Sequence, residues 1–233
     1  MKNKKILFIV LMLLPLLISG ICLFFLPDEF PAVAGLNLIV NENGMASKFN
    51  VLIFPVVSLF FGLLVPFMAR GSVKEHDGNE GNVKVIYTVG TALLAFFNLL
   101  NIILLIVAFK GFKSVDELSF DIYKTLFIAL GVLMIISGNI MPKARMNSYL
   151  GLRTPWSMKD EDSWKKCQRF GGIVLIIQGI ILIIAAALTT GGLCVALSLI
   201  IVFFGGIIQM GGSLAVVSKD VKKEQKEQKK EVK

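Results

Sequence analysis

The sequence predicts an all-α integral membrane protein with six transmembrane helices and both termini in the cytoplasm. Of its 233 residues, 55% are hydrophobic and 17% are charged, whereas a soluble domain has roughly 45–50% apolar and about 25% charged residues. The apolar residues are gathered into six segments of the length that crosses a bilayer. The basic residues are concentrated in the two termini and in the loop between the fourth and fifth spans, and six spans would place all three on the same side of the membrane.

Each apolar segment is interpreted as one spanning helix, which needs about 20 apolar residues. The fourth and fifth segments are short, while the third and sixth are long enough to tilt in the bilayer. Five contain no Asp, Glu, Lys or Arg, and the third contains only Lys84, at its start. The predicted spans are residues 6–26, 51–69, 83–109, 126–141, 172–189 and 193–217.

The first span follows Lys2, Lys4 and Lys5, which resemble the basic start of a secretion signal. Its apolar run exceeds the about 7–15 residues of a signal-peptide core, and no small-residue cleavage site follows it. We therefore expect this segment to be retained as the first helix.

Basic residues are distributed unequally between the predicted loops. The loop between the fourth and fifth spans has seven Lys and Arg residues, whereas the loop between the first two spans has only Lys48. Because cytoplasmic loops carry the excess of Lys and Arg, the former loop and both termini are predicted to be cytoplasmic. The tail alternates Lys with Glu and Gln and has no aromatic residue to stack on bases, so we expect it to lie near anionic headgroups and not to bind nucleic acid directly.

Several classes of function find no support in these residues. The spans lack the carboxylates and His residues that proton-coupled transporters place inside their bundles. With one histidine, His76, and no metal- or phosphate-binding motif, no catalytic residue, metal or cofactor is predicted, and the chain is not expected to be an enzyme. The three cysteines are far apart and predict free thiols.

Amide side chains are the main polar groups within the spans. Asn98 and Asn101 share one face of the third span because they are three residues apart, while Gln178 and Gln209 lie in the fifth and sixth spans. An amide in hydrocarbon needs a hydrogen-bond partner, which a neighbouring helix can supply. These amides can therefore hold helices together or line a polar cavity, and the sequence leaves both interpretations open.

The most distinctive segment is the polar, basic stretch at residues 138–172, which contains both tryptophans of the chain. Pro142 is expected to end the fourth helix, and the turn-forming residues after it predict an ordered loop at the membrane surface. Residues 158–170 are predicted to form a short amphipathic helix at the interface, with Met158, Trp164 and Phe170 facing the membrane.

This segment resembles the C-terminal domain of the SdpI family of bacterial membrane proteins. The family pattern runs G-N-x-M-P-K, then N-x-x-x-G-[IL]-R-T-P-W-[ST], then a further Trp and a final Gly. The family usually has Thr-His-Arg where this chain has Cys167, Gln168 and Arg169. The matching residues, which include the candidate functional residues, are Gly138, Asn139, Met141, Pro142, Lys143, Asn147, Gly151, Arg153, Thr154, Pro155, Trp156, Trp164, Arg169 and Gly172.

The resemblance implies a domain organisation. Residues 126–217 correspond to the SdpI-like domain, with spans four to six. Residues 11–64 correspond to a degenerate form of an N-terminal domain that is common in the family. Residues 65–125 are then a connector with the third span, and residues 218–233 are a basic cytoplasmic tail.

The resemblance also implies a function. It suggests a multi-pass immunity protein of the bacterial plasma membrane that gives resistance to a secreted peptide toxin. It further implies signalling, in which a soluble transcriptional repressor is held at the membrane. The outer loops, residues 27–50 and 110–125, would then meet the toxin, while the inner basic loop and the tail would meet the repressor.

Two alternatives remain beside this interpretation. The chain could be a small-molecule or lipid carrier that uses the face of Asn98 and Asn101. It could also be an inner-leaflet enzyme in which Lys143 and Arg153 bind a phosphate, since Arg suits such contacts.

Overall fold

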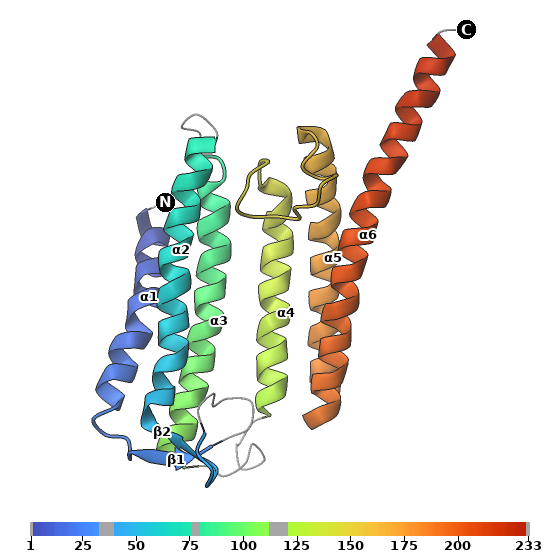
Figure 1. Ribbon diagram of the computed structural model, residues 1–233. Coiled ribbons are helices and arrows are strands. Elements are labelled where there is room, and N and C mark those ends of the chain that lie inside the picture. The colour runs from blue at the N-terminus through green and yellow to red at the C-terminus, as the bar shows by residue number, and fades with distance from the viewer. Residues whose placement is uncertain (1, 33–39, 76–79, 112–120, 232–233) are drawn as a thin grey trace.

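The computed structural model describes residues 2–32, 40–75, 80–111 and 121–231, and it confirms the all-α membrane architecture. Six helices are long and apolar enough to cross a membrane. They run side by side, and both termini lie at the same end of the bundle (Figure 1). The helices are α1 (Lys2–Cys22), α2 (Ile53–Glu75), α3 (Val83–Lys110), α4 (Ile122–Ile140), α5 (Glu161–Leu188) and α6 (Gly191–Glu231).

The helices form two groups of three. In the first group, Phe8 of α1, Val65 of α2 and Leu94 of α3 belong to one buried apolar cluster. In the second, Leu182 of α5 and Cys194 of α6 belong to another, which also includes a residue of α4. Among the described helices, the extensive contact between the two groups is that of α3 with α4. The outer surface is apolar, as expected of a bundle that lies in lipid.

Close packing of α4 on α5 depends on glycine. A Cβ atom added to Gly138 would come within 2.5 Å of the Gly172 carbonyl oxygen, and one added to Gly172 within 2.6 Å of the Gly138 oxygen. Gly131 and Gly179 form an equivalent pair two helical turns away. Small residues that let helix backbones approach are a common basis of packing in membranes, where no hydrophobic effect drives helices together.

The end of the bundle opposite the termini has a short hairpin that the sequence did not predict. Strands β1 (Glu29–Pro31) and β2 (Met45–Ser47) pair antiparallel, with Phe30 opposite Ala46. Both of these side chains are buried in a cluster with residues of α3, such as Leu104. A 3₁₀ turn, η1 (Lys48–Leu52), then leads into α2. We call this region, residues 23–32 and 40–52, the hairpin end (Figure 1).

The predicted helix boundaries are wrong in the fifth span. Residues 158–170 do not form a separate interfacial helix, because α5 begins at Glu161 and continues without a break through the predicted span. Asp160 caps α5, since its carboxylate accepts a hydrogen bond of 2.7 Å from the Ser163 N–H. Helix α6 likewise continues into the predicted tail, as far as Glu231.

Candidate functional site

The candidate site is the segment between α4 and α5, residues 141–160, which we call the signature loop. It begins with a 3₁₀ turn, η3 (Met141–Lys143), and ends at Asp160, the cap of α5. It lies at the same end of the bundle as both termini, which we call the loop end (Figure 1). The loop contains eight of the eleven predicted motif candidates, and the other three lie in α4 and α5.

Asn147 closes the first turn of the loop. Its side-chain oxygen accepts hydrogen bonds from the N–H groups of Tyr149 and Leu150, at 2.9 and 2.8 Å. Its side-chain nitrogen donates to the carbonyls of Arg145 and Leu150, at 2.7 and 3.2 Å. Asn147 is buried, so these bonds replace water that could not reach the backbone. The motif asparagine therefore fixes the shape of the loop.

Asn82, at the start of α3, attaches the loop to the first group of helices. Its oxygen accepts from the Arg145 N–H at 2.8 Å, and its nitrogen lies 3.3 Å from the Arg145 carbonyl. The same nitrogen donates to the Ser72 hydroxyl of α2 at 3.0 Å. Sequence reasoning missed Asn82, because nothing in its local sequence identifies a partner 63 residues away.

Gln168 of α5 holds the middle of the loop. Its side-chain oxygen accepts from the Leu152 N–H at 2.9 Å, and its nitrogen donates to the Leu152 carbonyl at 3.0 Å. Gly151 lies beside it with a φ of +122°, and an added Cβ would lie 2.6 Å from the Gln168 oxygen. Gln168 stands where the family usually has His, and its amide pairs with both polar groups of one backbone residue.

The Thr154–Pro155–Trp156–Ser157 segment forms a tight turn. The Thr154 N–H donates to the Ser157 hydroxyl oxygen at 2.8 Å, and the Ser157 N–H donates to the Thr154 hydroxyl oxygen at 3.2 Å. Both side chains are buried, whereas Pro155 is exposed. The reciprocal bonds satisfy groups that would otherwise be unpaired at the surface of the bundle.

Trp156 joins this turn to α6. Its indole Nε1 donates to the Ser213 hydroxyl at 2.7 Å, and that hydroxyl lies 2.7 Å from the Met210 carbonyl. The Cys167 thiol of α5 contacts the Ser213 carbonyl at 3.6 Å. The loop is thus connected to α3, α5 and α6. Some of the side chains that make these connections, such as Trp156, belong to the motif, and others, such as Asn82 and Ser213, do not.

Trp164 does not face the membrane, contrary to the sequence prediction. Its side chain is fully buried, and its Nε1 donates to the Ala144 carbonyl at 2.8 Å. It packs in a cluster with Val85 of α3 and Ala144. A partner for the indole N–H inside the protein removes the reason for the ring to stay at the lipid interface. Phe170 is half-buried against Gly212 of α6.

The basic residues of the motif point outward. Lys143, Arg153 and Arg169 are exposed, as are Pro142 and Asn139. At the end of the loop, the hydrogen bond from the Ser163 N–H holds the pKa of the Asp160 carboxyl below its ordinary value. The signature loop therefore combines a buried, hydrogen-bonded backbone with a cationic surface.

The intramembrane amides lie in two separate places and not on one shared face. In the first group, the Asn98 nitrogen donates to the Leu11 carbonyl of α1 at 2.8 Å. Asn101 exchanges hydrogen bonds with the Ser19 hydroxyl of α1, at 3.1 and 3.2 Å. Both asparagines thus join α3 to α1, which is the contact expected of interhelical packing.

The second pair of amides joins α5 to α6. The Gln178 nitrogen donates to the carbonyls of Ile201 and Val202, at 3.0 and 3.1 Å. The Gln209 nitrogen donates to the Gln178 oxygen at 3.3 Å. Within the described residues, no group of three or more His, Cys, Asp or Glu side chains could hold a metal ion. His76 and residues 33–39 and 112–120, which belong to the loops predicted to be outer, lie outside the described part of the chain.

Comparison with known proteins points to the same region. Residues 143–215, from the signature loop into α6, match the model of the SdpI/YfhL protein family. Over 180 residues the chain is 28% identical to the "Immunity protein SdpI" of Bacillus subtilis (strain 168), which covers 77% of this chain and 79% of that protein. No solved structure matches this chain significantly.

Proposed function

We propose that this chain, which belongs to the SdpI family, is a multi-pass immunity protein of the bacterial cell membrane that protects its cell against a secreted peptide toxin. The alignment to the Bacillus subtilis immunity protein carries the proposal. Its 180 residues exceed the length of the second helix group, so the likeness extends beyond the signature loop into the first group. In this proposal the role is one of binding, in which the chain recognises the toxin.

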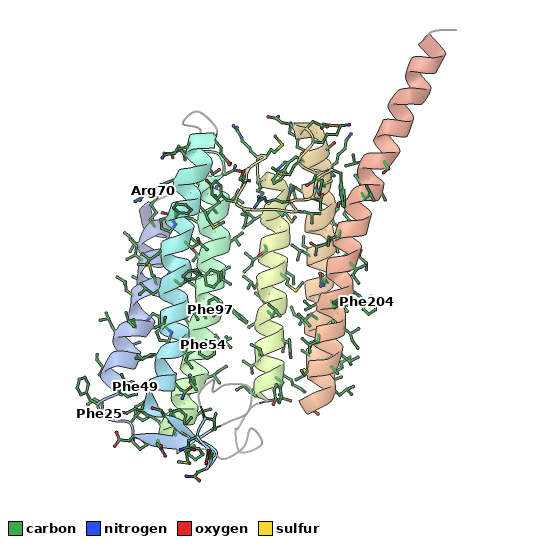
Figure 2. All side chains as sticks on the ribbon, viewed as in Figure 1. Phe25, Phe49, Phe54, Arg70, Phe97 and Phe204 are labelled. Atoms are coloured by element: carbon green, nitrogen blue, oxygen red, sulfur yellow. The ribbon has the colours of Figure 1, made fainter. Side chains whose placement is uncertain are left out.

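The loop end is assigned to the cytoplasm. The fold adds Arg70, Lys74 and Lys84 to the cations of the signature loop, since the end of α2 and the start of α3 lie there (Figure 2). At the hairpin end, Lys48 is paired with Asp28 at 2.6 Å. This asymmetry supports the positive-inside orientation. The hairpin end then faces the outside, where a secreted toxin arrives.

The hairpin end has the aromatic surface that an apolar peptide would need. The side chains of Phe24, Phe25 and Phe49 are 88%, 74% and 60% exposed. Phe25 and Phe49 lie at that end in Figure 2, whereas Phe204 lies on the outer side of α6, midway along the bundle. An exposed aromatic group at the outer surface can bind a peptide or rest in the lipid headgroups. We assign this aromatic surface to toxin binding.

Survival assays test the immunity function directly. Deleting the gene for this chain should make the cell sensitive to the co-encoded secreted peptide, and wild-type expression should restore resistance. In that background, Phe49→Ala should weaken resistance, while Phe204→Ala should not, because Phe204 faces lipid in this proposal. Unchanged survival of the deletion strain would refute immunity. Equal effects of the two substitutions would refute only the assignment of the toxin surface.

A second partner, a cytosolic transcriptional repressor, belongs to the loop end in this proposal. The exposed Arg153 on the rigid signature loop supports it, because a fixed cation can form a specific contact. Arg153→Ala should release the repressor from the membrane fraction more than Lys226→Ala or Lys229→Ala in the tail. Equal retention in all three variants would argue against a signalling role of the loop.

The carrier alternative has a specific test. Asn98 and Asn101 both bond to α1, which favours packing over a ligand cavity. Replacing both with Leu should therefore leave resistance intact wherever the protein still reaches the membrane. Loss of resistance with a normally folded double variant would instead favour a functional polar face.

A further inference from the structure

We propose that the loop end holds one anionic phospholipid, with its phosphate between Lys143 and Arg145 and an acyl chain between α3 and α4. This site goes beyond toxin immunity and does not depend on it. It is assembled from three neighbouring cavities, which differ in polarity from the loop end toward the middle of the bundle.

The first cavity would receive the phosphate. It has a volume of about 460 Å³ and lies between the start of the signature loop and the start of α5. Three of its lining residues are cations, Lys143, Arg145 and Lys165, and one is an anion, Glu161. Because η3 directly follows the end of α4, this cavity lies at the depth where lipid phosphates are found.

Two of these cations are available to a ligand. Glu161 lies 3.6 Å from Lys165 and offsets its charge. Among the described residues, neither Lys143 nor Arg145 has a carboxylate within ion-pairing distance. Asn82 holds both backbone polar groups of Arg145, so the guanidinium extends from a fixed point. A preorganised pair of cations favours a phosphate, to which Arg can donate two hydrogen bonds.

The second cavity would receive the glycerol region. Its volume is about 280 Å³, and Ala144 lines both this cavity and the first one. Its other walls are mostly apolar, but Ser137 and Gln209 contribute polar groups. The Gln209 side-chain nitrogen donates to the Gln178 oxygen. Among the described residues, the Gln209 side-chain oxygen and the Ser137 hydroxyl then remain available to a polar ligand. An ester-bearing segment has this mixture of polarity.

The third cavity would receive an acyl chain. It has a volume of about 240 Å³ and lies between α3 and α4, the two helices through which the helix groups contact each other. Val89 of the second cavity and Ala92, Phe96 and Leu99 of the third follow one face of α3 at helical spacing. Small side chains such as Ala92 and Ala129 keep this groove open. Two cations that have no carboxylate partner among the described residues, followed by a cavity of mixed polarity and then an apolar groove, fit a phospholipid.

Native mass spectrometry of the purified full chain in mild detergent tests this site. Phosphatidylglycerol, phosphatidylcholine and inorganic phosphate serve as separate probes. Phosphatidylglycerol should bind at one copy per chain and resist competition by inorganic phosphate. In K143A/R145A its affinity should fall roughly thirtyfold, since each cation near a headgroup contributes about fivefold. The matched variant R70A/K159A removes two other loop-end cations and should bind within about twofold of wild type.

Separate variants test the groove proposed for the acyl chain. A92F/A129F should fill the groove and abolish stoichiometric binding, while A215F, on an exposed face of α6, should not. If K143A/R145A fails to fold, K143Q/R145Q removes the same charges with longer side chains and takes its place. Equal losses in K143A/R145A and R70A/K159A would overturn the site in favour of diffuse surface charge. Full competition by inorganic phosphate, or no effect of A92F/A129F, would overturn the lipid in favour of a bare phosphate site.

Discussion

The two ends of the bundle stabilise their non-helical segments in different ways. Each must stabilise a polar, non-helical segment at the surface of an apolar bundle. At the loop end, side chains from three helices hold the signature loop. Asn82 and Gln168 bind its backbone, and the Ser213 hydroxyl accepts a hydrogen bond from the Trp156 indole. At the hairpin end, strands β1 and β2 pair with each other, and the polar side-chain contacts are largely exposed.

A substitution at the loop end should therefore affect the stability of the whole bundle more than one at the hairpin end. Breaking a buried hydrogen bond at the loop end leaves an unpaired polar group and loosens a helix contact at the same time. At the hairpin end, water can take the place of a broken hydrogen bond, because the groups that form it are already exposed. Matched substitutions at the two ends should therefore differ in their effect on stability.

Glycines with positive φ should show the largest difference. Gly151 has a φ of +122° and no space for a side chain, whereas Gly44 has a φ of +73° and nothing within 4 Å of an added Cβ. Gly44→Ala should lower the free energy of unfolding by about 1–2 kcal/mol, from backbone strain alone. Gly151→Ala adds overpacking against Gln168 and should cost roughly 3–5 kcal/mol. Thermal unfolding of both variants in the same detergent measures the gap, and equal losses would contradict it.

Two turn-forming asparagines provide the next comparison. The Asn147 and Asn41 side-chain oxygens each accept two backbone N–H groups, but Asn147 is buried and Asn41 is exposed. Asn147→Ala should cost about 2–3 kcal/mol, because the freed backbone groups stay out of water. Asn41→Ala should cost about 0.5–1 kcal/mol. Hydrogen exchange adds a local readout: protection should be lost throughout residues 145–150 in the first variant. Retained protection there would show that Asn147 is not the residue that fixes the loop.

Gln168 gives a smaller, graded effect. Gln168→Leu removes both bonds to Leu152, although the Leu152 carbonyl keeps the Ser157 hydroxyl as a partner at 2.8 Å. The unpaired N–H should then cost about 2 kcal/mol. Gln168→His should cost about 1 kcal/mol, because an imidazole can keep one of the two bonds. The order wild type, His, Leu in unfolding temperature is the expected result. A His variant as stable as wild type would show that the family residue fits this backbone equally well.

The sequence was sufficient for the helices but not for what fixes the loop. The six spans follow from apolar length, because a membrane leaves the chain few other solutions. The β1–β2 hairpin was missed, since strands of three residues carry no periodic pattern. Trp164 was wrongly assigned to the lipid interface. Its indole N–H binds the Ala144 carbonyl, 20 residues earlier, and the local sequence does not show this partner. Asn82 was missed, and Gln168 was noted only as a departure from the family pattern, because the sequence does not show which distant group an amide side chain binds.

The hairpin end should contribute the smallest effect, and that effect should depend on pH. The hydrogen bond from Lys48, together with its charge, holds the pKa of the Asp28 carboxyl below its ordinary value in the folded protein. The stabilisation is therefore present above the unfolded-state pKa of about 4 and is lost as the pH falls through the folded-state pKa. Asp28→Asn should be slightly less stable than wild type near neutral pH, with the difference vanishing in acid. Because Asp28 is 91% exposed, added salt should also shrink the difference. A difference that stays constant from neutral to acidic pH would mean that this pair does not stabilise the hairpin through charge.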